Sequence, residues 1–355
     1  MTREARYSNP LPRRPGAAAL VSLAMVLLAL TGCGSSPDRA ASAFGARVLA
    51  HWSSLAHVQR VLDLTAARRD GRLIVAADGL LALWRPGGAP TPFARGPGGY
   101  SNPGGEEPYL ALSTGSTVRS RRCAFPPDTA YVLALEKTPG VVAVDRQGRV
   151  RPFVALPGTG LLDGIAFDGT GRFGHRLLVT RTEGSASTVF AIDCRGGVDV
   201  VTRRAPKVEG GIAVAPATFG PFAGQLIAPD ENSGRIFAIA PSGGSRVVAD
   251  SGLPAGGDVG VESGAFVPRL RPGVVALLAD RLTPGNPHPG DDAILGLGAS
   301  ALRRVGVAPG DLLIATEGGA RTDAVRCART CQVRHVADGP DIAHAEGHIV
   351  FAARG

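Results

Sequence analysis

The sequence predicts an all-β fold, a six-bladed β-propeller of four-stranded antiparallel blades, with seven blades as the alternative. Short apolar runs recur along the chain, Gly- and Pro-bearing turns separate them, and from Asp63 onward the pattern repeats about every 45 residues. The composition agrees, because 44% apolar residues, 49 glycines and 28 prolines in 355 residues suit short strands joined by tight turns. One such unit cannot bury both of its faces alone, so the units must stack to form a core.

Residues 209–240 form the clearest unit. They contain Glu209-Gly-Gly-Ile-Ala-Val-Ala-Pro, then a turn, then Gln225-Leu-Ile-Ala-Pro-Asp-Glu-Asn-Ser-Gly-Arg-Ile-Phe-Ala-Ile-Ala240. The second strand of each blade is expected to be an apolar run with little alternation, because both sheet faces pack on neighbouring blades. Second strands are expected at residues 72–77, 131–135, 176–181, 225–229, 274–279 and 311–316, and third strands at residues 79–84, 140–145, 187–193, 234–240, 292–298 and 322–327.

The fifth blade and the closing blade have the least certain register. Residues 302–307 are either the last strand of the fifth blade or part of the first strand of the sixth. Residues 341–345 and 348–353 are expected to pair and to complete a blade begun by N-terminal strands, which closes the ring and hides its edges. The lead-in between residues 44 and 63 is expected to be loosely helical or irregular.

The N-terminal residues 1–32 have the features of an export signal. An Arg-bearing segment precedes an apolar run over residues 17–30, which is short for a membrane span and ends in Thr31-Gly32-Cys33. This segment resembles a bacterial lipoprotein signal, and the resemblance implies acyl chains such as palmitate on Cys33, anchoring the protein to the extracytoplasmic membrane surface. The alternative is an ordinary cleaved signal with a chance cysteine. Residues 33–44 are expected to be a flexible tether, and residues 45–355 a single propeller domain.

Four further cysteines are expected to form two disulfides, since export places them in an oxidising compartment. The loop that carries Cys123 and the turn that carries Cys194 lie on one face of adjacent blades, so we expect these two to pair. Cys327 and Cys331 are expected to pair across the end of a hairpin. The alternative, metal ligation, lacks the cysteine and histidine spacing of zinc sites.

The charge pattern does not indicate a nucleic-acid partner. The formal net charge is +8, and it falls to about +5 when the leader is removed. Arginines are scattered, and Lys137 and Lys207 are the only lysines. A stripe of basic residues with interleaved aromatics, as in a groove that follows phosphates, is missing.

Acidic residues recur where first strands begin and second strands end. In a meandering blade these two positions lie on the same face, so the acids are expected to surround one mouth of the central channel. Converging carboxylates must pair, protonate or bind a cation, and oxygen ligands suit Ca²⁺ or another hard divalent cation. The alternative is a structural role, in which the acids bond turn amides or pair with arginines. The candidate metal or ligand residues are Glu107, Asp163, Glu209, Asp230, Glu231, Asn232, Glu262, Glu317 and Asp341.

Two strand pairs carry a resemblance to a known superfamily. Asp163-Gly-Ile-Ala-Phe-Asp168 followed by Arg176-Leu-Leu-Val-Thr, and the pair within residues 209–236, resemble six-bladed propellers of the gluconolactonase and NHL-repeat superfamily. In gluconolactonase-like enzymes a channel metal is held at Glu-Gly-Pro-type, Asn-Gly and Asp-Gly strand entrances. Asp163-Gly164 matches the last of these and Glu107-Pro108 loosely matches the first, whereas the chain contains no Asn-Gly pair.

Two features near the expected mouth have alternative interpretations. Residues 281–292 form a long Pro-rich interruption, predicted either as a lid that carries His288, Asp291 and Asp292 or as a rigid surface excursion. His344 is either a general base near the mouth or a core histidine with its hydrogen bonds satisfied.

Two functions remain open from the sequence. The first is a binding or interaction module for a small-molecule or protein ligand, acting through a divalent cation. The second is a metal-dependent hydrolase of a lactone or related ester, in which the ion polarises the carbonyl and a carboxylate moves a proton. The chain has no Gly-x-Ser-x-Gly, P-loop or HExxH motif, which argues against a serine hydrolase, a P-loop nucleotide enzyme and a zincin. An acidic mouth without a clear nucleophile, base or complete ligand triad favours the binding module.

Overall fold

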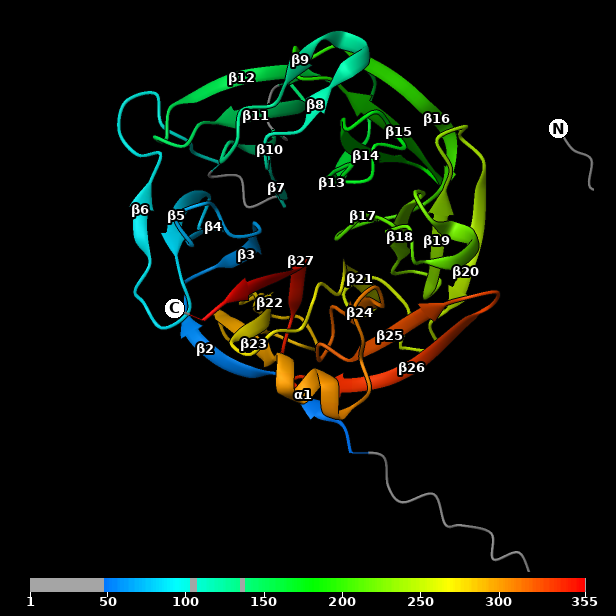
Figure 1. Ribbon diagram of the computed structural model, residues 1–355. Coiled ribbons are helices and arrows are strands. Elements are labelled where there is room, and N and C mark those ends of the chain that lie inside the picture. Colours follow the sequence, from blue (N-terminus) through cyan, green and yellow to red (C-terminus); the bar gives the residue numbers. More distant parts are fainter. Residues whose placement is uncertain (1–47, 103–106, 135–137, 355) are drawn as a thin grey trace, which may run out of the picture. The chain divides into compact units, whose positions relative to one another are not determined.

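A computed structural model describes residues 48–102, 107–134 and 138–354, and these residues form a six-bladed β-propeller (Figure 1). Six sheets of four antiparallel strands surround a central axis, and one sheet is extended by a short parallel strand, β1 (Ala50–His51). The prediction of six blades is therefore confirmed.

The first four blades are simple meanders in which the chain runs from the axis outward. Their strands lie close to the predicted positions, because each apolar run is bounded by turn residues. Blade 1 contains β3 (Val61–Leu64), β4 (Leu73–Ala77), β5 (Leu80–Trp84) and β6 (Thr91–Phe93); blade 2 contains β7 (Leu110–Leu112), β10 (Ala130–Ala134), β11 (Gly140–Val144) and β12 (Val150–Ala155). Blade 3 contains β13 (Leu161–Phe167), β14 (Leu177–Glu183), β15 (Ala186–Ile192) and β16 (Val198–Pro206); blade 4 contains β17 (Ala213–Val214), β18 (Leu226–Asp230), β19 (Arg235–Ile239) and β20 (Ser245–Asp250).

The last two blades exchange strands, which corrects the predicted register. In blade 5, β21 (Val261–Phe266) pairs with β24 (Leu312–Thr316), followed by β25 (Thr322–Cys327) and β26 (Cys331–Asp338). The hairpin of β22 (Val274–Asp280) and β23 (Ala293–Gly298), which interrupts this blade in the sequence, lies in blade 6. There it pairs with β27 (Ala345–Ala353) on the axis side and with β2 (Ser53–His57) on the outer side.

Three further predictions about these blades were wrong in detail. Residues 302–307 are not a strand, because α1 (Ala299–Arg304) follows β23 and buries Ala299 and Leu302 while Arg303 and Arg304 stay exposed. The expected C-terminal pair is the single strand β27, and the lead-in contains the strands β1 and β2. Closure by both ends of the chain is confirmed, since β2 and β27 belong to one sheet.

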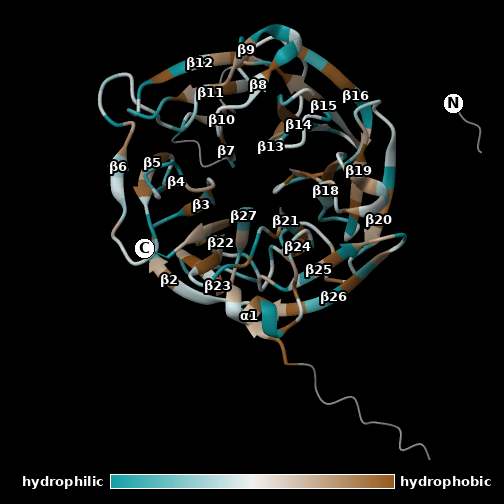
Figure 2. Ribbon diagram, in the orientation of Figure 1, coloured by the Kyte–Doolittle hydropathy of each residue, from teal (hydrophilic) through white to brown (hydrophobic). Residues whose placement is uncertain are grey.

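The core lies within and between the blades. Figure 2 shows hydrophobic segments on the strands and hydrophilic segments on many connections. Middle strands such as β10 and β24 are almost fully buried, as their uniform apolar composition predicts. An aromatic cluster of Phe125, Tyr131 and Phe167 packs edge to face between blades 2 and 3.

A buried carboxylate joins the inner strands at the axis. Asp63 in β3 is fully buried and accepts hydrogen bonds from the backbone N–H groups of Leu64 at 2.8 Å, Leu110 at 2.7 Å and His348 at 2.8 Å. The His348 ring also contacts Asp63, with Nδ1 3.0 Å from Oδ2, and its Nε2 lies 3.0 Å from the Ile165 carbonyl oxygen. One ion pair thus connects β3, β7, β13 and β27.

Both predicted disulfides are confirmed. Cys123–Cys194 has a Cα–Cα distance of 5.9 Å and joins an excursion of blade 2 to the β15–β16 turn of blade 3. That excursion contains β8 (Thr117–Val118), a 3-10 turn at Arg119–Arg121 and β9 (Cys123–Ala124). Cys327–Cys331 closes the β25–β26 hairpin with a Cα–Cα distance of 4.0 Å.

The predicted leader, the tether and Cys33 lie outside the described residues. Within the part of the chain that the structure describes, none of the helices has the length and hydropathy of a membrane span.

Replacing Gly347 by alanine is expected to destabilise the propeller. Gly347 has a φ of +66°, and an added Cβ would lie 2.5 Å from Asp63 Oδ1. The backbone strain alone costs about 1–2 kcal/mol, and displacement of Asp63 adds to it. Denaturant unfolding measures the loss, and Gly244→Ala is the control, because a Cβ there meets nothing within 4 Å. Equal stability of the two variants would contradict the close approach of the inner strands at Gly347 and Asp63.

Removing the Cys123–Cys194 disulfide is expected to cost about 2–4 kcal/mol of the free energy of unfolding. The double variant Cys123→Ser with Cys194→Ser frees a loop with a sequence separation of 71, whereas Cys327→Ser with Cys331→Ser frees one of 4. In the chain-entropy account the longer loop contributes more. Denaturant unfolding of both double variants tests this, and a larger loss for the hairpin variant would refute it.

Candidate functional site: an acidic mouth at the axis

Seven carboxylates gather where the inner strands begin. One inner strand belongs to each blade, and the acids before or at the start of these strands act on one another's pKa values, so they lie around one end of the axis. Second strands end on the same face, as predicted from the alternation of antiparallel strands. We call this group the acidic mouth; it consists of Glu107, Asp163, Glu209, Glu231, Glu262, Glu317 and Glu346.

Two of these acids occupy β-bulges. Leu162 pairs with Arg181 and Gly164 with Thr180, so Asp163 is the extra residue of β13. Glu262 is likewise the extra residue of β21 opposite β24. A bulge re-aims a side chain and kinks the strand, which accounts for buried acids within apolar inner strands.

Tyr109 lies at the centre of one part of the acidic mouth. Its hydroxyl oxygen is 3.0 Å from Glu107 Oε2 and 3.3 Å from Glu346 Oε2, and it also contacts Glu262 Oε1. A phenol has a single proton to donate, so Tyr109 can donate to only one of these three oxygens. The crowding of oxygens here therefore favours either a protonated carboxyl or a bound cation.

Three cationic side chains offset part of the negative charge among the described residues. Arg281 contacts Glu107 at 3.1 Å and Glu346 at 3.2 Å. His344 Nε2 lies 2.9 Å from Glu317 and 3.3 Å from Glu346. Lys207 lies 3.6 Å from Glu209 and 3.9 Å from Glu231. Seven acids thus face three bases.

Burial and the neighbouring carboxylates raise the pKa values of these acids. The charge of Glu346 together with burial raises the pKa of Glu107 to about 8. Burial raises the pKa of Asp163 to about 7 and that of Glu231 to about 7, and it raises the pKa of Glu262 well above its ordinary value. Without a bound cation the acidic mouth therefore takes up protons near neutral pH.

In the absence of a bound cation, the neighbouring carboxylates raise the pKa of His344. Burial lowers its pKa, but hydrogen bonds to Glu317 and Glu346 outweigh burial and raise the pKa to about 10. A histidine that is already protonated cannot accept a proton as a general base. Both earlier interpretations therefore change, since His344 is buried yet its Nδ1 has no hydrogen-bond partner.

The donor set fits a hard divalent cation. Two groups offer ligand atoms within 4.8 Å of one another, Glu317 with His344 and Glu346, and Glu107 with Glu262 and Glu346. Thr180 donates to Asp163 Oδ1 at 2.8 Å, whereas Asp163 Oδ2 is buried without a hydrogen-bond partner. Carboxylate oxygens dominate, as Ca²⁺ and Mg²⁺ prefer.

The structure brings together six of the residues selected from the sequence, namely Glu107, Asp163, Glu209, Glu231, Glu262 and Glu317. Asn232 lies beside this group, since its side-chain amide donates to Glu231 Oε1 at 2.9 Å, whereas Asp230 and Asp341 have other roles. Asp230 accepts hydrogen bonds from the Ser233 hydroxyl and from the Asn232 N–H at 3.2 Å, as in a structural turn. Asp341 is exposed in the loop before β27, and its place on the inner strand is taken by Glu346.

The predicted lid is fastened to the loop before β27. His288 Nδ1 lies 2.6 Å from the Asp341 carbonyl oxygen, and the Gly290 N–H donates to the Ile342 carbonyl at 2.7 Å. Asp292 is buried and accepts the Arg60 N–H at 2.7 Å, and Asp291 precedes it in the same segment. These contacts favour a rigid excursion. His288 also lines a cavity of about 720 Å³ beside Gly318, next to Glu317.

Sequence reasoning missed the roles of Tyr109, Arg281 and Glu346. The sequence pattern places the inner strand at residues 341–345, whereas β27 begins at Ala345, so Glu346 lies at the start of the inner strand. Tyr109 directly follows the Glu107-Pro108 strand entrance. That entrance predicted a site at Glu107, but nothing in the pattern indicated a role for the tyrosine. Arg281 belongs to the hairpin that changes blade, so its neighbours depend on long-range pairing.

The fold and the site together define a class, a six-bladed β-propeller with a carboxylate-rich mouth on its axis. No protein-family model matches the chain, and no curated protein shows significant sequence similarity to it.

Several solved structures show a distant likeness to this chain. A chain of a nidogen/laminin complex is 13% identical over 85% of this chain and 89% of that chain, with a TM-score of 0.48. Virginiamycin B lyase from Staphylococcus aureus is 12% identical over 86% and 98%, with a TM-score of 0.43. A putative gluconolactonase is 16% identical over 65% and 72%, with a TM-score of 0.38. At these values the likeness concerns the fold, and no activity follows from it.

In the presence of a chelator, thermal stability is expected to fall as the pH rises from about 5 to about 9. Folding raises the pKa values of Glu107, Asp163 and Glu231. The folded state therefore holds their protons more tightly than the unfolded state does. The resulting stability is fully present at a pH below their ordinary pKa values near 4, and it is lost by about pH 8. His344 acts in the same direction between 6.5 and about 10. Melting temperature against pH tests this, and a flat or rising profile would contradict it.

Proposed function

We propose that the protein is an extracytoplasmic binding module that takes up a divalent cation at the acidic mouth and through it binds a small-molecule or protein ligand. The convergence of seven carboxylates with three bases is the observation that carries the proposal. A bound cation would be held by these carboxylates in place of the protons that they otherwise hold, and it would supply positive charge for a ligand at the mouth.

Glu346 is central to the proposed cation site. It belongs to both groups of ligand atoms, it contacts Arg281 and His344, and its side chain is 1% exposed. A divalent ion at this position would relieve the repulsion that raises the pKa of Glu107. When bound, the ion supplies positive charge for an anionic or carbonyl group of the ligand.

The contacts of His344 and Tyr109 support the binding role. Burial lowers the pKa of His344, but hydrogen bonds to Glu317 and Glu346 raise it to about 10 in the absence of a cation, so His344 balances the charge of these carboxylates. Tyr109, whose pKa is raised well above 10 by burial and by neighbouring carboxylates, holds its own proton. The contacts of the acidic mouth therefore support cation and ligand binding more directly than proton abstraction.

The two disulfides support an oxidising compartment for this module. Together with the lipoprotein-like leader they lead us to propose a protein held at the extracytoplasmic membrane surface by lipid on Cys33, with the tether between the anchor and the propeller.

Calorimetric titration with Ca²⁺ and Mg²⁺ is expected to show one class of binding site in the wild type. Glu346→Gln is expected to weaken binding by about tenfold or more, since it removes a ligand common to both groups. Binding should tighten with rising pH and release protons, which titration in buffers of different ionisation enthalpy detects.

Asp341→Asn is the matched control, because Asp341 lies on the same face but outside both groups. No heat of binding in the wild type for either ion, or equal losses in the two variants, would refute the cation site. Turnover of a lactone that a chelator abolishes would instead support the hydrolase.

A further inference from the structure

The face opposite the acidic mouth has a distinct charge. In each blade the connections from the first to the second strand and from the third to the fourth strand emerge there, because antiparallel strands alternate in direction. We call the residues of these connections the basic face. They are residues 65–72, 85–90, 113–129, 145–149, 168–176, 193–197, 215–225, 240–244, 267–273, 299–311 and 328–330.

The basic face is almost entirely cationic. Its connections contain seventeen arginines and six aspartates, with neither lysine nor glutamate. Fourteen of the arginines are exposed, whereas Asp70 is the one exposed aspartate. The charge that reaches solvent on this face is therefore strongly positive.

The aspartates of the basic face are occupied by their own loops. Asp168 accepts the N–H groups of Thr170 and Gly171, each at 2.9 Å. Asp193 accepts the N–H groups of Arg195 at 2.8 Å and Gly197 at 2.9 Å. These carboxylates hold tight turns. Five of the seventeen arginines form ion pairs with aspartates, namely Arg68 and Arg72 with Asp70, Arg149 with Asp145, and Arg121 and Arg176 with Asp199, so the balance of the face stays positive.

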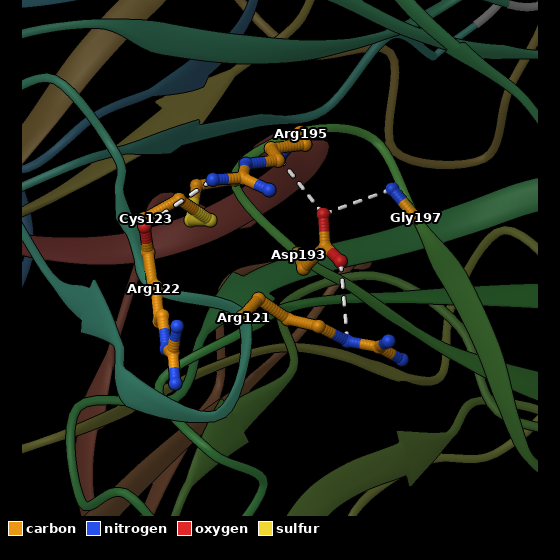
Figure 3. The surroundings of a disulfide bond; sticks show 7 residues. Arg121, Arg122, Cys123, Asp193, Arg195 and Gly197 are labelled. Carbon is orange, nitrogen blue, oxygen red and sulfur yellow. Dashed lines mark hydrogen bonds and ion pairs between the residues drawn. A yellow bond between two sulfur atoms is a disulfide. The ribbon is translucent and has the colours of Figure 1, made fainter.

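Figure 3 shows this arrangement beside the Cys123–Cys194 disulfide. Arg121 reaches Asp193 at 3.4 Å, and Arg195 donates to the Arg122 carbonyl at 3.4 Å. The Arg122 guanidinium lies away from Asp193 in this view. The disulfide thus fixes three arginines of two blades side by side on the basic face.

The opposite side of the propeller carries the opposite balance. The described connections on the side of the acidic mouth contain nine acidic residues and five arginines or lysines. The propeller is therefore electrically polarised along its axis. Such a molecule turns its cationic side toward an anionic surface and its anionic side away from it.

We propose that the basic face docks on the surface of an anionic phospholipid bilayer. Its charge is spread over the loops of five blades rather than along one groove, which suits a broad planar surface better than a nucleic-acid strand. The exposed large apolar side chains of the described residues, Val48, Leu161, Val200, Val247, Leu282 and Ile342, all lie outside the basic face. The contact is thus electrostatic, without insertion into the hydrocarbon core.

This docking would direct the acidic mouth away from the membrane. The metal ion and the ligand then approach from the side of bulk solvent, where the negative lipid charge does not compete for the ion. The docking surface itself does not depend on the cation site, because no residue of the acidic mouth belongs to it.

Co-sedimentation with vesicles tests the docking surface. The chain of residues 45–355 is used, since it contains every strand of the closed ring and lacks the leader. It is expected to bind vesicles of phosphatidylglycerol and phosphatidylcholine, to ignore pure phosphatidylcholine, and to dissociate near 1 M salt, where the Debye length is about 3 Å. The combined variant Arg119→Glu, Arg146→Glu, Arg269→Glu and Arg304→Glu is expected to lose about tenfold or more in affinity.

A matched variant makes the same charge change at exposed arginines outside the basic face, Arg95→Glu, Arg203→Glu, Arg204→Glu and Arg235→Glu. It is expected to keep most of the binding. Equal losses in the two variants, binding that salt does not affect, or preference for DNA over anionic vesicles would overturn the proposal. Cation titration of both variants separates this result from the acidic mouth, since neither variant changes that site.

Discussion

The Asp63–His348 ion pair is the contact on which the centre of the propeller depends. Burial alone would lower the pKa of His348, but the neighbouring carboxylate of Asp63 raises it, and the two side chains lie in contact at the axis. Asp63 also accepts three backbone N–H groups, and His348 reaches the Ile165 carbonyl. A buried ion pair is costly unless its remaining hydrogen bonds are satisfied, and here the backbone of the inner strands satisfies them. That requirement fixes how closely four of the six strands approach.

Close approach at the axis has a consequence for the acidic mouth. Gly210, Gly211 and Gly347 let the inner strands pass with little space for side chains, since a Cβ on any of them would meet a neighbouring strand. Glu107, Glu262 and Glu346 are then held within contact of Tyr109. The raised pKa values are the electrostatic cost of this arrangement, and a cation would reduce that cost. Stability and the proposed function are thus opposed at the same residues.

The same topology separates the charges of the molecule. Connections from the first to the second strand and from the third to the fourth strand lie on the basic face, and the remaining connections lie on the side of the acidic mouth. The position of a loop residue in the repeat therefore decides which of the two surfaces it belongs to. All cationic side chains of the basic face are arginines, and aspartates such as Asp168 and Asp193 accept hydrogen bonds from backbone N–H groups of their own turns. A lipid-bound propeller of this kind would present one face to the anionic bilayer and the other to its ligand. Both proposals therefore rest on one geometric fact, the alternating direction of antiparallel strands.

The sequence alone determined the strands, the disulfides and most of the acids. Apolar runs bounded by turn residues are local signals, and they located strands such as β10 and β18 closely. The alternation of strand direction is also local, so it placed Glu107, Asp163 and Glu262 on one face. Only the tertiary structure decided which strands pair across long distances. The β22–β23 hairpin joins β27 rather than β21, which brought Arg281 to Glu346. Strand pairing depends on the packing of the whole ring, and a local sequence pattern does not specify which distant strand a given strand pairs with.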